Sequence, residues 1–355
     1  MGVMPDSAKK TIVLACGGYA SVHVINALES TLDRTKYALV IVNPRPYYLH
    51  LISALRAATT ADAQLIKDSL MPYDGLDGVV YVQGKAAAVE QAAPGRGGAL
   101  VLESGERVEY AALAVRGHFE TWKERIAQAS NVVIVGGGAV GIEQAGEIRD
   151  VYPTKKIVIV HSGMLLLNNT YPDKFRKNIE KRVRDRGIDV VLGDHIDQFP
   201  EVGTVVDVET RSGKVLKEVD LVNISQIPAY GPRPNTMWLH SLGAGVLSDK
   251  GYVKTLPTLE VIGHPGVFAL GDILDWPEQK QAGKLMFHAG VVVPNLLSFL
   301  GGKPQKKLYK GTWEALILSI GRAHGGGITL GAWWTSLPKG RTLFVPMAKR
   351  RLHYK

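Results

Sequence analysis

Three glycines with the spacing of a dinucleotide-binding turn are the clearest chemical signal in this 355-residue sequence. Gly136-x-Gly138-x-x-Gly141 follows an apolar, β-branched run and precedes a helical pattern. The first glycine allows a tight turn, the second lets a pyrophosphate approach the backbone, and the third lets the helix pack on the strand. Because free N–H groups at a helix start stabilise phosphates, this spacing predicts a dinucleotide site.

His161 stands at the end of the next strand, where an acid usually binds the adenosine ribose. A neutral or cationic side chain there relaxes the preference for NAD over NADP. The sequence therefore predicts bound NAD(P)H and leaves the choice between NADH and NADPH open.

A second glycine turn, near the N-terminus, is altered. If Gly18 takes the central position, Cys16 and Ser21 stand where the flanking glycines belong. A side chain at the first position disfavours a positive φ, and one at the third separates helix from strand. Asn43 replaces the ribose-binding acid. Its amide oxygen can still accept a hydrogen bond from the ribose, but it lacks the negative charge of a carboxylate. Together these changes predict a weakened or lost cofactor site.

Each glycine turn joins a short apolar strand to a helix, and each has a further strand downstream, at 37–42 and 156–160. Right-handed β-α-β units are the simplest fold for this pattern, which predicts an α/β protein with two Rossmann-like dinucleotide-binding domains. Alternating apolar residues at 78–83, 99–103 and 107–115 predict an antiparallel β-meander between them.

Several segments together resemble the apoptosis-inducing-factor-like flavoproteins, most nearly their ferroptosis-suppressor (AMID-like) NAD(P)H:quinone oxidoreductase subgroup. The segments are residues 42–57, 132–148, 267–273 and 343–346, with the strand-end pair His161 and Ser162. The resemblance covers nearly the whole chain. It implies a fold of the pyridine nucleotide-disulfide reductase type, with FAD in the first domain and NAD(P)H in the second.

The resemblance also implies roles for individual residues. Gly18, Asn43 and the pair Gly271 and Asp272 would belong to the FAD site, with Asp272 contacting the ribityl chain, and Glu143 would lie near the nicotinamide. Hydride would pass from nicotinamide to flavin and then to a quinone-like acceptor.

The expected domains are a discontinuous FAD-type domain, an NAD(P)-type domain and a small basic C-terminal segment. Their boundaries are 1–125 with 250–300, 126–249, and 301–355.

Four parts of the FAD side depart from the family pattern. One is the altered first turn with Asn43. Arg116–Gly117–His118 replaces an alanine-threonine-glycine turn, and the linker after it is shorter than expected by about 20 residues. Gln226 and Ile227 replace a second threonine-glycine pair. The departures predict weak or lost FAD.

Other residues allow two interpretations. Tyr48 or His50 could donate a proton or stack on a bound ring, and half-buried packing is the alternative. His288, close to Lys284, is expected to be a structural histidine. His324 has no partner at metal-binding spacing, so no metal is predicted.

Positive charge is concentrated at the C-terminus. Residues 301–355 hold eleven Lys and Arg and one acid, Glu314, whereas residues 1–300 have a net charge of −1. A neutral body with a basic segment carrying Trp313, Trp333 and Trp334 favours peripheral contact with an anionic membrane over nucleic acid. A solvated basic face is the alternative.

The sequence predicts no membrane span, because the apolar run at 285–300 contains His288, Pro294 and Asn295. The N-terminus lacks the apolar core of a signal peptide, and a lone cysteine excludes an internal disulfide. We expect an intracellular protein, cytoplasmic or peripheral on a membrane.

Three functions compete. The first is an FAD-dependent NAD(P)H oxidoreductase that reduces a quinone-like or other small hydrophobic acceptor. The second is a repurposed enzyme of small-molecule biosynthesis, a cyclase or isomerase, without FAD-dependent redox chemistry. The third is a membrane-surface binding module that rests on the basic segment alone. The first is preferred on whole-chain resemblance.

Overall fold

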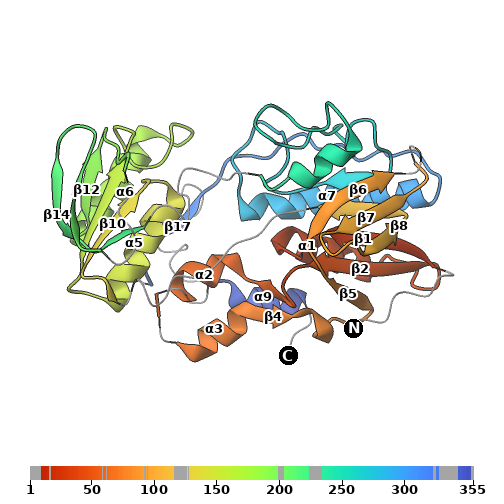
Figure 1. Cartoon of the computed structure of the whole chain (residues 1–355), viewed down its shortest axis with the longest axis horizontal. Coiled ribbons are helices and arrows are strands. Elements are labelled where there is room, and N and C mark those ends of the chain that lie inside the picture. The colour runs from red at the N-terminus through yellow and green to blue at the C-terminus, as the bar shows by residue number, and fades with distance from the viewer. Residues whose placement is uncertain are drawn as a thin grey trace.

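The computed structural model contains two parallel sheets flanked by helices, as the sequence predicts (Figure 1). It describes residues 9–15, 17–57, 59–60, 62–91, 93, 95–115, 126, 128–198, 204–223, 234–322, 325–327 and 343–352. The predicted α/β class with two Rossmann-like domains is confirmed.

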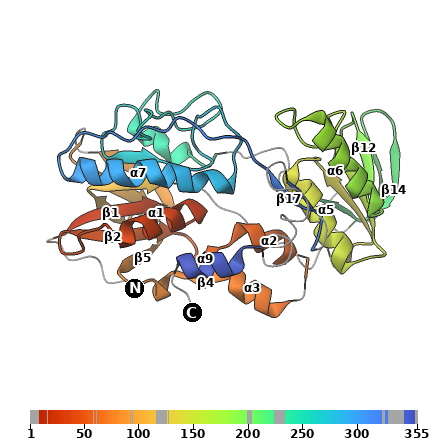
Figure 2. The same cartoon turned by 180° about the vertical axis from the view of Figure 1, so that it is seen from behind.

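The first domain is built on a parallel five-stranded sheet in the order β16-β9-β1-β2-β5. Its strands are nearly continuous apolar runs, which suits strands buried on both faces. α1 and α7 pack against each other on this sheet (Figure 2). The elements are β1 (Lys10–Ala15), α1 (Tyr19–Glu29), β2 (Tyr37–Asn43), β5 (Val79–Gln83), β9 (Ala112–Val115), β16 (Val267–Ala269) and α7 (Leu285–Leu300).

The second domain has a parallel four-stranded sheet in the order β12-β11-β10-β15. An antiparallel hairpin of β13 and β14 adjoins it. The elements are β10 (Asn131–Val135), α5 (Ala139–Val151), β11 (Lys156–His161), α6 (Asp173–Asp185), β12 (Asp189–Leu192), β13 (Val206–Glu209), β14 (Val215–Val219) and β15 (Leu221–Asn223).

Short elements complete both domains. They are β3 (Tyr47–Leu49), α2 (Leu51–Ala57), α3 (Ala63–Ser69), β4 (Leu70–Pro72), η1 (Tyr73–Gly75), β6 (Ala86–Gln91), β7 (Gly98–Leu102), β8 (Arg107–Tyr110), η2 (Met237–Leu242), η3 (Ala282–Lys284), β17 (Ile317–Ser319), β18 (Gly325–Gly327) and α9 (Val345–Arg351).

The predicted meander is only partly right. β6, β7 and β8 form an antiparallel sheet, but β5 and β9 are parallel strands of the first sheet. Alternation alone does not distinguish these two settings, since the partner strands lie far away in sequence.

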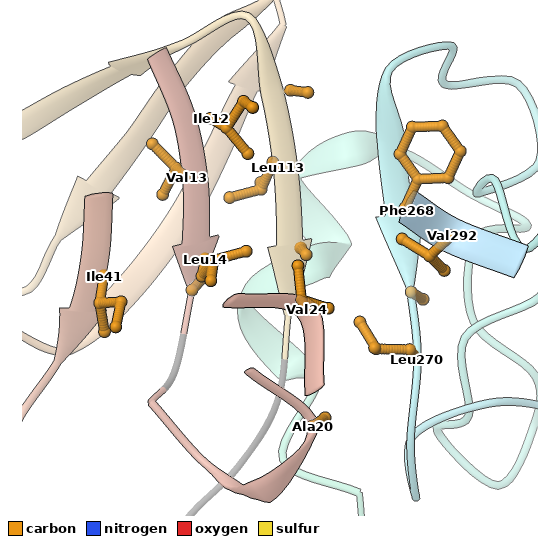
Figure 3. Close-up of a cluster of buried hydrophobic side chains, with 14 of the residues drawn as sticks. Ile12, Val13, Leu14, Ala20, Val24, Ile41, Leu113, Phe268, Leu270 and Val292 are labelled. Carbon is orange, nitrogen blue, oxygen red and sulfur yellow. The ribbon is translucent and has the colours of Figure 1, made fainter. Parts of the chain in front are cut away.

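The core of the first domain lies between its sheet and α1 and α7. Leu14, Leu113, Phe268, Val24 and Val292 meet there and are fully buried (Figure 3). A separate apolar core fills the second domain between its sheet and α5 and α6.

Two expected domain boundaries need correction. Trp238, Leu239 and Val246 pack in the first core, so the chain has returned to the first domain before residue 250. Residues 301–355 are not a separate segment either. Their described parts contribute to both cores, with Tyr309, Ala348 and Leu352 in the first, and Leu316, Leu318 and Ile320 in the second.

The stretch Ala282–Leu300 is the single one, within the described ranges, that is long and apolar enough to cross a membrane. Half of it is buried inside the protein. His288 and Asn295 on its buried side are hydrogen-bonded, as in the core helix of a folded domain.

A buried ion pair joins the two domains. Arg56 of α2 donates to Glu147 of α5 through Nε at 2.6 Å and Nη2 at 2.8 Å, and both side chains are 3% exposed. The bidentate geometry fixes the orientation of α2 on α5.

Replacing Glu147 with Ala should lower the free energy of unfolding by about 3–5 kcal/mol, because Arg56 would stay buried without its counter-charge. Urea titration measures this loss. The double variant Arg56→Met/Glu147→Leu should recover most of it, and a double variant as unstable as the single one would contradict the account. As a control, Asp185→Ala breaks an exposed ion pair with Lys181 and should lower the free energy of unfolding by less than about 1 kcal/mol.

Candidate functional site

The second glycine turn has the geometry that phosphate binding requires. Gly136 has φ +111°, and a Cβ on Gly141 would lie 2.1 Å from the Gly136 carbonyl oxygen. α5 begins after Gly138 without a side-chain cap, so its first N–H groups remain available to a phosphate. The tight turn at Gly136 and the close packing at Gly141 agree with their predicted roles. The pyrophosphate contact of Gly138 stays a prediction.

His161 braces this turn. Its Nδ1 accepts the N–H of Gly137 at 3.1 Å, and burial lowers the pKa of the imidazole. The neutral ring therefore replaces the usual acid without a negative charge. His161 adds no negative charge that would repel the 2′-phosphate of NADPH, so the choice between NADH and NADPH stays open.

The first turn is braced in the same way. Asn43, the last residue of β2 as His161 is of β11, accepts the N–H of Gly17 through Oδ1 at 3.1 Å. Its Nδ2 donates to the Arg45 carbonyl at 2.8 Å. Asn43 thus has a structural role besides the ribose contact expected of it.

Tyr73 also holds the first turn, and sequence reasoning missed it. Its buried hydroxyl donates to the Gly17 carbonyl. A Cβ on Gly17 would lie 1.8 Å from the Tyr73 hydroxyl oxygen. Its ring stacks on Tyr81 at 5.2 Å, and Tyr81 donates to the Asn43 carbonyl at 3.1 Å. Burial raises the pKa of Tyr81 to about 12, which keeps this donor protonated.

The predicted FAD residues come together around the start of α1. Gly18 precedes α1 and no side chain caps the helix. Gly271 has φ +87°, and a Cβ there would lie 3.8 Å from the Ala20 Cβ and 3.1 Å from Leu285 Cδ2. The Gly271 and Asp272 turn therefore adjoins the helix start.

The uncapped start of α1 is compatible with the pyrophosphate of FAD. The expected contact of Asp272 with the ribityl chain stays a prediction. The ribose position lacks its acid because Asn43 is neutral. Cys16 and the altered turns at 116–118 and 226–227 lie outside the described residues.

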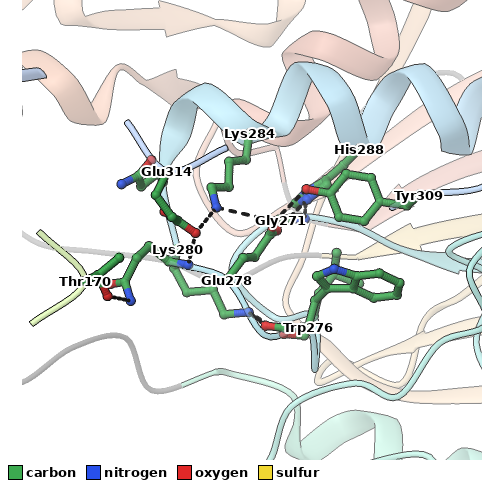
Figure 4. Close-up of polar contacts among 12 residues, drawn as sticks. Thr170, Gly271, Trp276, Glu278, Lys280, Lys284, His288, Tyr309 and Glu314 are labelled. Atoms are coloured by element: carbon green, nitrogen blue, oxygen red, sulfur yellow. Dashed lines mark hydrogen bonds and ion pairs between the residues drawn. The ribbon is translucent and has the colours of Figure 1, made fainter. Parts of the chain in front are cut away.

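A buried polar network fixes the Gly271 turn (Figure 4). His288 accepts the Gly271 N–H through Nδ1 at 3.1 Å and donates to Glu278 through Nε2 at 2.9 Å. Tyr309 donates to the other Glu278 oxygen at 2.6 Å, and Lys284 Nζ lies 2.6 Å from Glu314. The expectation that His288 is structural is confirmed. Glu278 and Tyr309 carried no recognisable sequence signal.

The same network reaches the second domain. The backbone N–H of Gln279 donates to Glu314 at 3.1 Å. The side chain of Gln279 accepts from Asn168 at 2.9 Å and donates to Thr170 at 3.1 Å. The loop before α7 thus connects the Gly271 turn to the second domain.

Glu143 has a protein partner. Its Oε1 accepts from the Ser319 N–H at 2.9 Å and from the Ser319 hydroxyl at 3.2 Å, which anchors β17 on α5. Its expected place beside the nicotinamide stays a prediction.

Tyr48 and His50 are fully buried, which supports packing over catalysis. The Tyr48 hydroxyl bonds His50 Nδ1 at 3.0 Å, and His50 Nε2 donates to the Leu343 carbonyl at 2.8 Å. The pair ties the C-terminal chain to the first domain. No three metal-binding side chains gather within the described part of the chain.

α9 extends this attachment. Arg351 donates to the Tyr19 hydroxyl at 3.2 Å and to His23 Nε2 at 3.3 Å, and Lys349 pairs with Asp68. Two cations expected to face a membrane are therefore bound to the first domain.

Comparison with known proteins agrees with this fold. A family model described as pyridine nucleotide-disulphide oxidoreductase matches residues 77–286. FAD-dependent oxidoreductase FVFD30 of Flammulina velutipes is 36% identical over 321 residues, which cover 81% of this chain and 97% of that protein. Ferroptosis suppressor protein 1 of Taeniopygia guttata is 26% identical, covering 96% of this chain and 95% of that one.

Among solved structures, the sulfide:quinone oxidoreductase of Aquifex aeolicus shares the fold, with a TM-score of 0.74. It is 15% identical and the match covers 97% of this chain and 92% of that one.

Acid should destabilise the attachment of α9 through His23. Burial, and then Arg351, lower the pKa of His23 from 6.5 to about 4. Below pH 6.5 the unfolded chain binds more protons at His23 than the folded protein does. The free energy of unfolding should therefore decrease by about 3 kcal/mol as the pH falls towards 4. His23→Gln should lessen the fall in unfolding free energy between pH 7 and 4 by about that amount, as urea titrations would measure. Tyr19→Phe should retain the full fall, and equal slopes in wild type and His23→Gln would refute the assignment.

Proposed function

Since this chain belongs to the pyridine nucleotide-disulphide oxidoreductase family, we propose that it oxidises NAD(P)H and reduces a quinone-like or other small hydrophobic acceptor with FAD. The observation that carries the proposal is the pair of glycine turns. Each precedes a helix without a side-chain cap, and each is braced by a strand-end side chain. One chain thus has two supports for a dinucleotide pyrophosphate.

The protein's own part is to bind and orient. α5 with Gly136, Gly138 and Gly141 would hold NAD(P)H, and α1 with the Gly271 and Asp272 turn would hold FAD. When bound, FAD supplies a flavin that can take up a hydride and pass electrons to an acceptor. The buried network under Gly271 keeps that turn fixed against α7.

The name of one relative supports the flavin assignment, since it is called an FAD-dependent oxidoreductase. The quinone-like acceptor also rests on the shared fold of a sulfide:quinone oxidoreductase.

A repurposed cyclase or isomerase is the second candidate. It is favoured by Asn43, whose amide has no charge and is hydrogen-bonded to the chain through both of its polar atoms. Such an enzyme would turn over its substrate without flavin or nicotinamide. Colourless protein that is active without either cofactor would establish this candidate.

Gly138→Val tests the second site. A branched side chain would stand where the pyrophosphate approaches the backbone, so NAD(P)H affinity should fall at least about tenfold. Fluorescence titration of NADH and NADPH measures the affinity, and circular dichroism checks the fold. Undiminished affinity in a folded variant would remove the nucleotide from α5.

Purified protein should hold less than one flavin per chain, and added FAD should restore it. Asn43→Asp would return an anionic acceptor for the ribose, and a charge-assisted bond of about 1.5 kcal/mol should tighten FAD roughly tenfold. Flavin absorbance after dialysis against graded FAD gives the affinity. The matched variant His161→Asp, in the second turn, should leave FAD binding unchanged. Equal FAD affinity in wild type and Asn43→Asp would contradict the role of the lost charge.

A further inference from the structure

One surface combines exposed apolar side chains with lysines that no acid accompanies. Residues 303–313 run antiparallel along α7 (Figure 2). Asn295 bonds the backbone of Lys307 at 2.7 and 3.0 Å, and Tyr309 packs on His288 with ring centroids 4.6 Å apart. Further along, Glu314 meets Lys284 near the start of α7.

The charged side chains of α7 and residues 303–313 are all basic. No acid occurs between Glu278 and Glu314 in the sequence. Four lysines of the strip are exposed, and none forms an ion pair with any residue that the structure describes; they are Lys303, Lys306, Lys307 and Lys310. Some exposed lysines elsewhere do have acidic partners, as Lys217 has Asp207.

Large apolar side chains are exposed on the same two adjoining elements, α7 and residues 303–313. Trp313 is 63% exposed, Met286 and Leu308 are 52% exposed, and Phe287 is 42% exposed. Gly290 of α7 is also exposed, with no atom near the position of a Cβ. Such side chains gathered on two adjoining elements indicate a binding surface, whereas scattered ones would not.

We propose that this α7 face, made of the exposed residues of α7 and of 303–313, binds an anionic phospholipid surface. Lysines are attracted to anionic headgroups, tryptophan prefers the membrane interface, and methionine, leucine and phenylalanine side chains enter the acyl boundary. Nucleic acid or an acidic protein would satisfy the lysines but leave these apolar side chains without a matching environment. The helix lies on the surface and does not span it, because its other side is core.

Residues 301–355 are the expected membrane contact, and within them the proposal assigns it to the strip at 303–313 and not to α9. Lys349 and Arg351 are held by Asp68, Tyr19 and His23, whereas the lysines of the strip are free to face lipid. Binding itself does not depend on the proposed reaction. If that reaction holds, the start of α7 beside Gly271 would face a membrane from which an apolar acceptor could come.

Sedimentation with vesicles of phosphatidylcholine, with and without phosphatidylserine, tests the proposal on the full-length protein. We expect binding only with phosphatidylserine, and loss of binding at high salt. Lys306→Gln/Lys310→Gln should weaken partition about 25-fold, at roughly 1 kcal/mol per charge. Lys174→Gln/Lys177→Gln removes two exposed lysines from α6 and should change nothing.

Trp313 reports insertion directly. Vesicles should shift tryptophan emission to the blue in wild type, and Trp313→Phe should lose most of that shift. Three outcomes would overturn the proposal: equal weakening by the α6 and strip variants, binding that ignores lipid charge, or retention on an acidic polypeptide without any vesicle binding. NAD(P)H oxidation is assayed separately, so failure of the reaction and failure of lipid binding are distinguishable.

Discussion

Both glycine turns depend on the same kind of hydrogen bond, from the middle N–H of the turn to the side chain that ends the neighbouring strand. Gly17 donates to Asn43 and Gly137 donates to His161, each at 3.1 Å. The turn must sit where the helix N–H groups can face a phosphate, and this bond holds it there. Because both acceptors are neutral, neither turn recognises ribose through a carboxylate. Under the proposed function, nucleotide binding would depend on the helix N-termini and on the close packing of glycines.

The second constraint is the path of the C-terminal chain, which visits both domains. Tyr309 packs in the first core, residues 316–320 pack on α5, and α9 returns to α1. The crossing requires Gly146, since a Cβ there would lie 2.4 Å from the Gly321 nitrogen. With the Arg56 and Glu147 pair, this path makes the relative position of the domains part of the folded core.

Sequence spacing predicted what is local. Gly136, Gly138, Gly141 and His161 belong to one β-α-β unit, so their arrangement follows from the pattern. Tyr73 lies 56 positions from Gly17, and Glu278 depends on Tyr309 across 31 positions. No local pattern marks such partners, because only the tertiary fold brings them together. The altered turn predicts a weakened or lost cofactor site, which stays a prediction, and Tyr73 and Asn43 hold Gly17 from outside the motif.

The net charge of the last 55 residues predicts that the C-terminal part of the chain is basic. It does not predict which of the basic side chains face solvent and which bind to the rest of the protein. Cations with buried or hydrogen-bonded partners, such as Arg351, hold the chain end in place, and those without such partners determine what the surface attracts. The two kinds separate along one helix. On its buried side α7 carries His288 and Lys284, which hold the Gly271 turn through Glu278 and Glu314. The exposed side of the helix is apolar, and the lysine-bearing strip packs along its edge beside His288 and Asn295. A contact made on this surface would therefore act on the element that positions the first site.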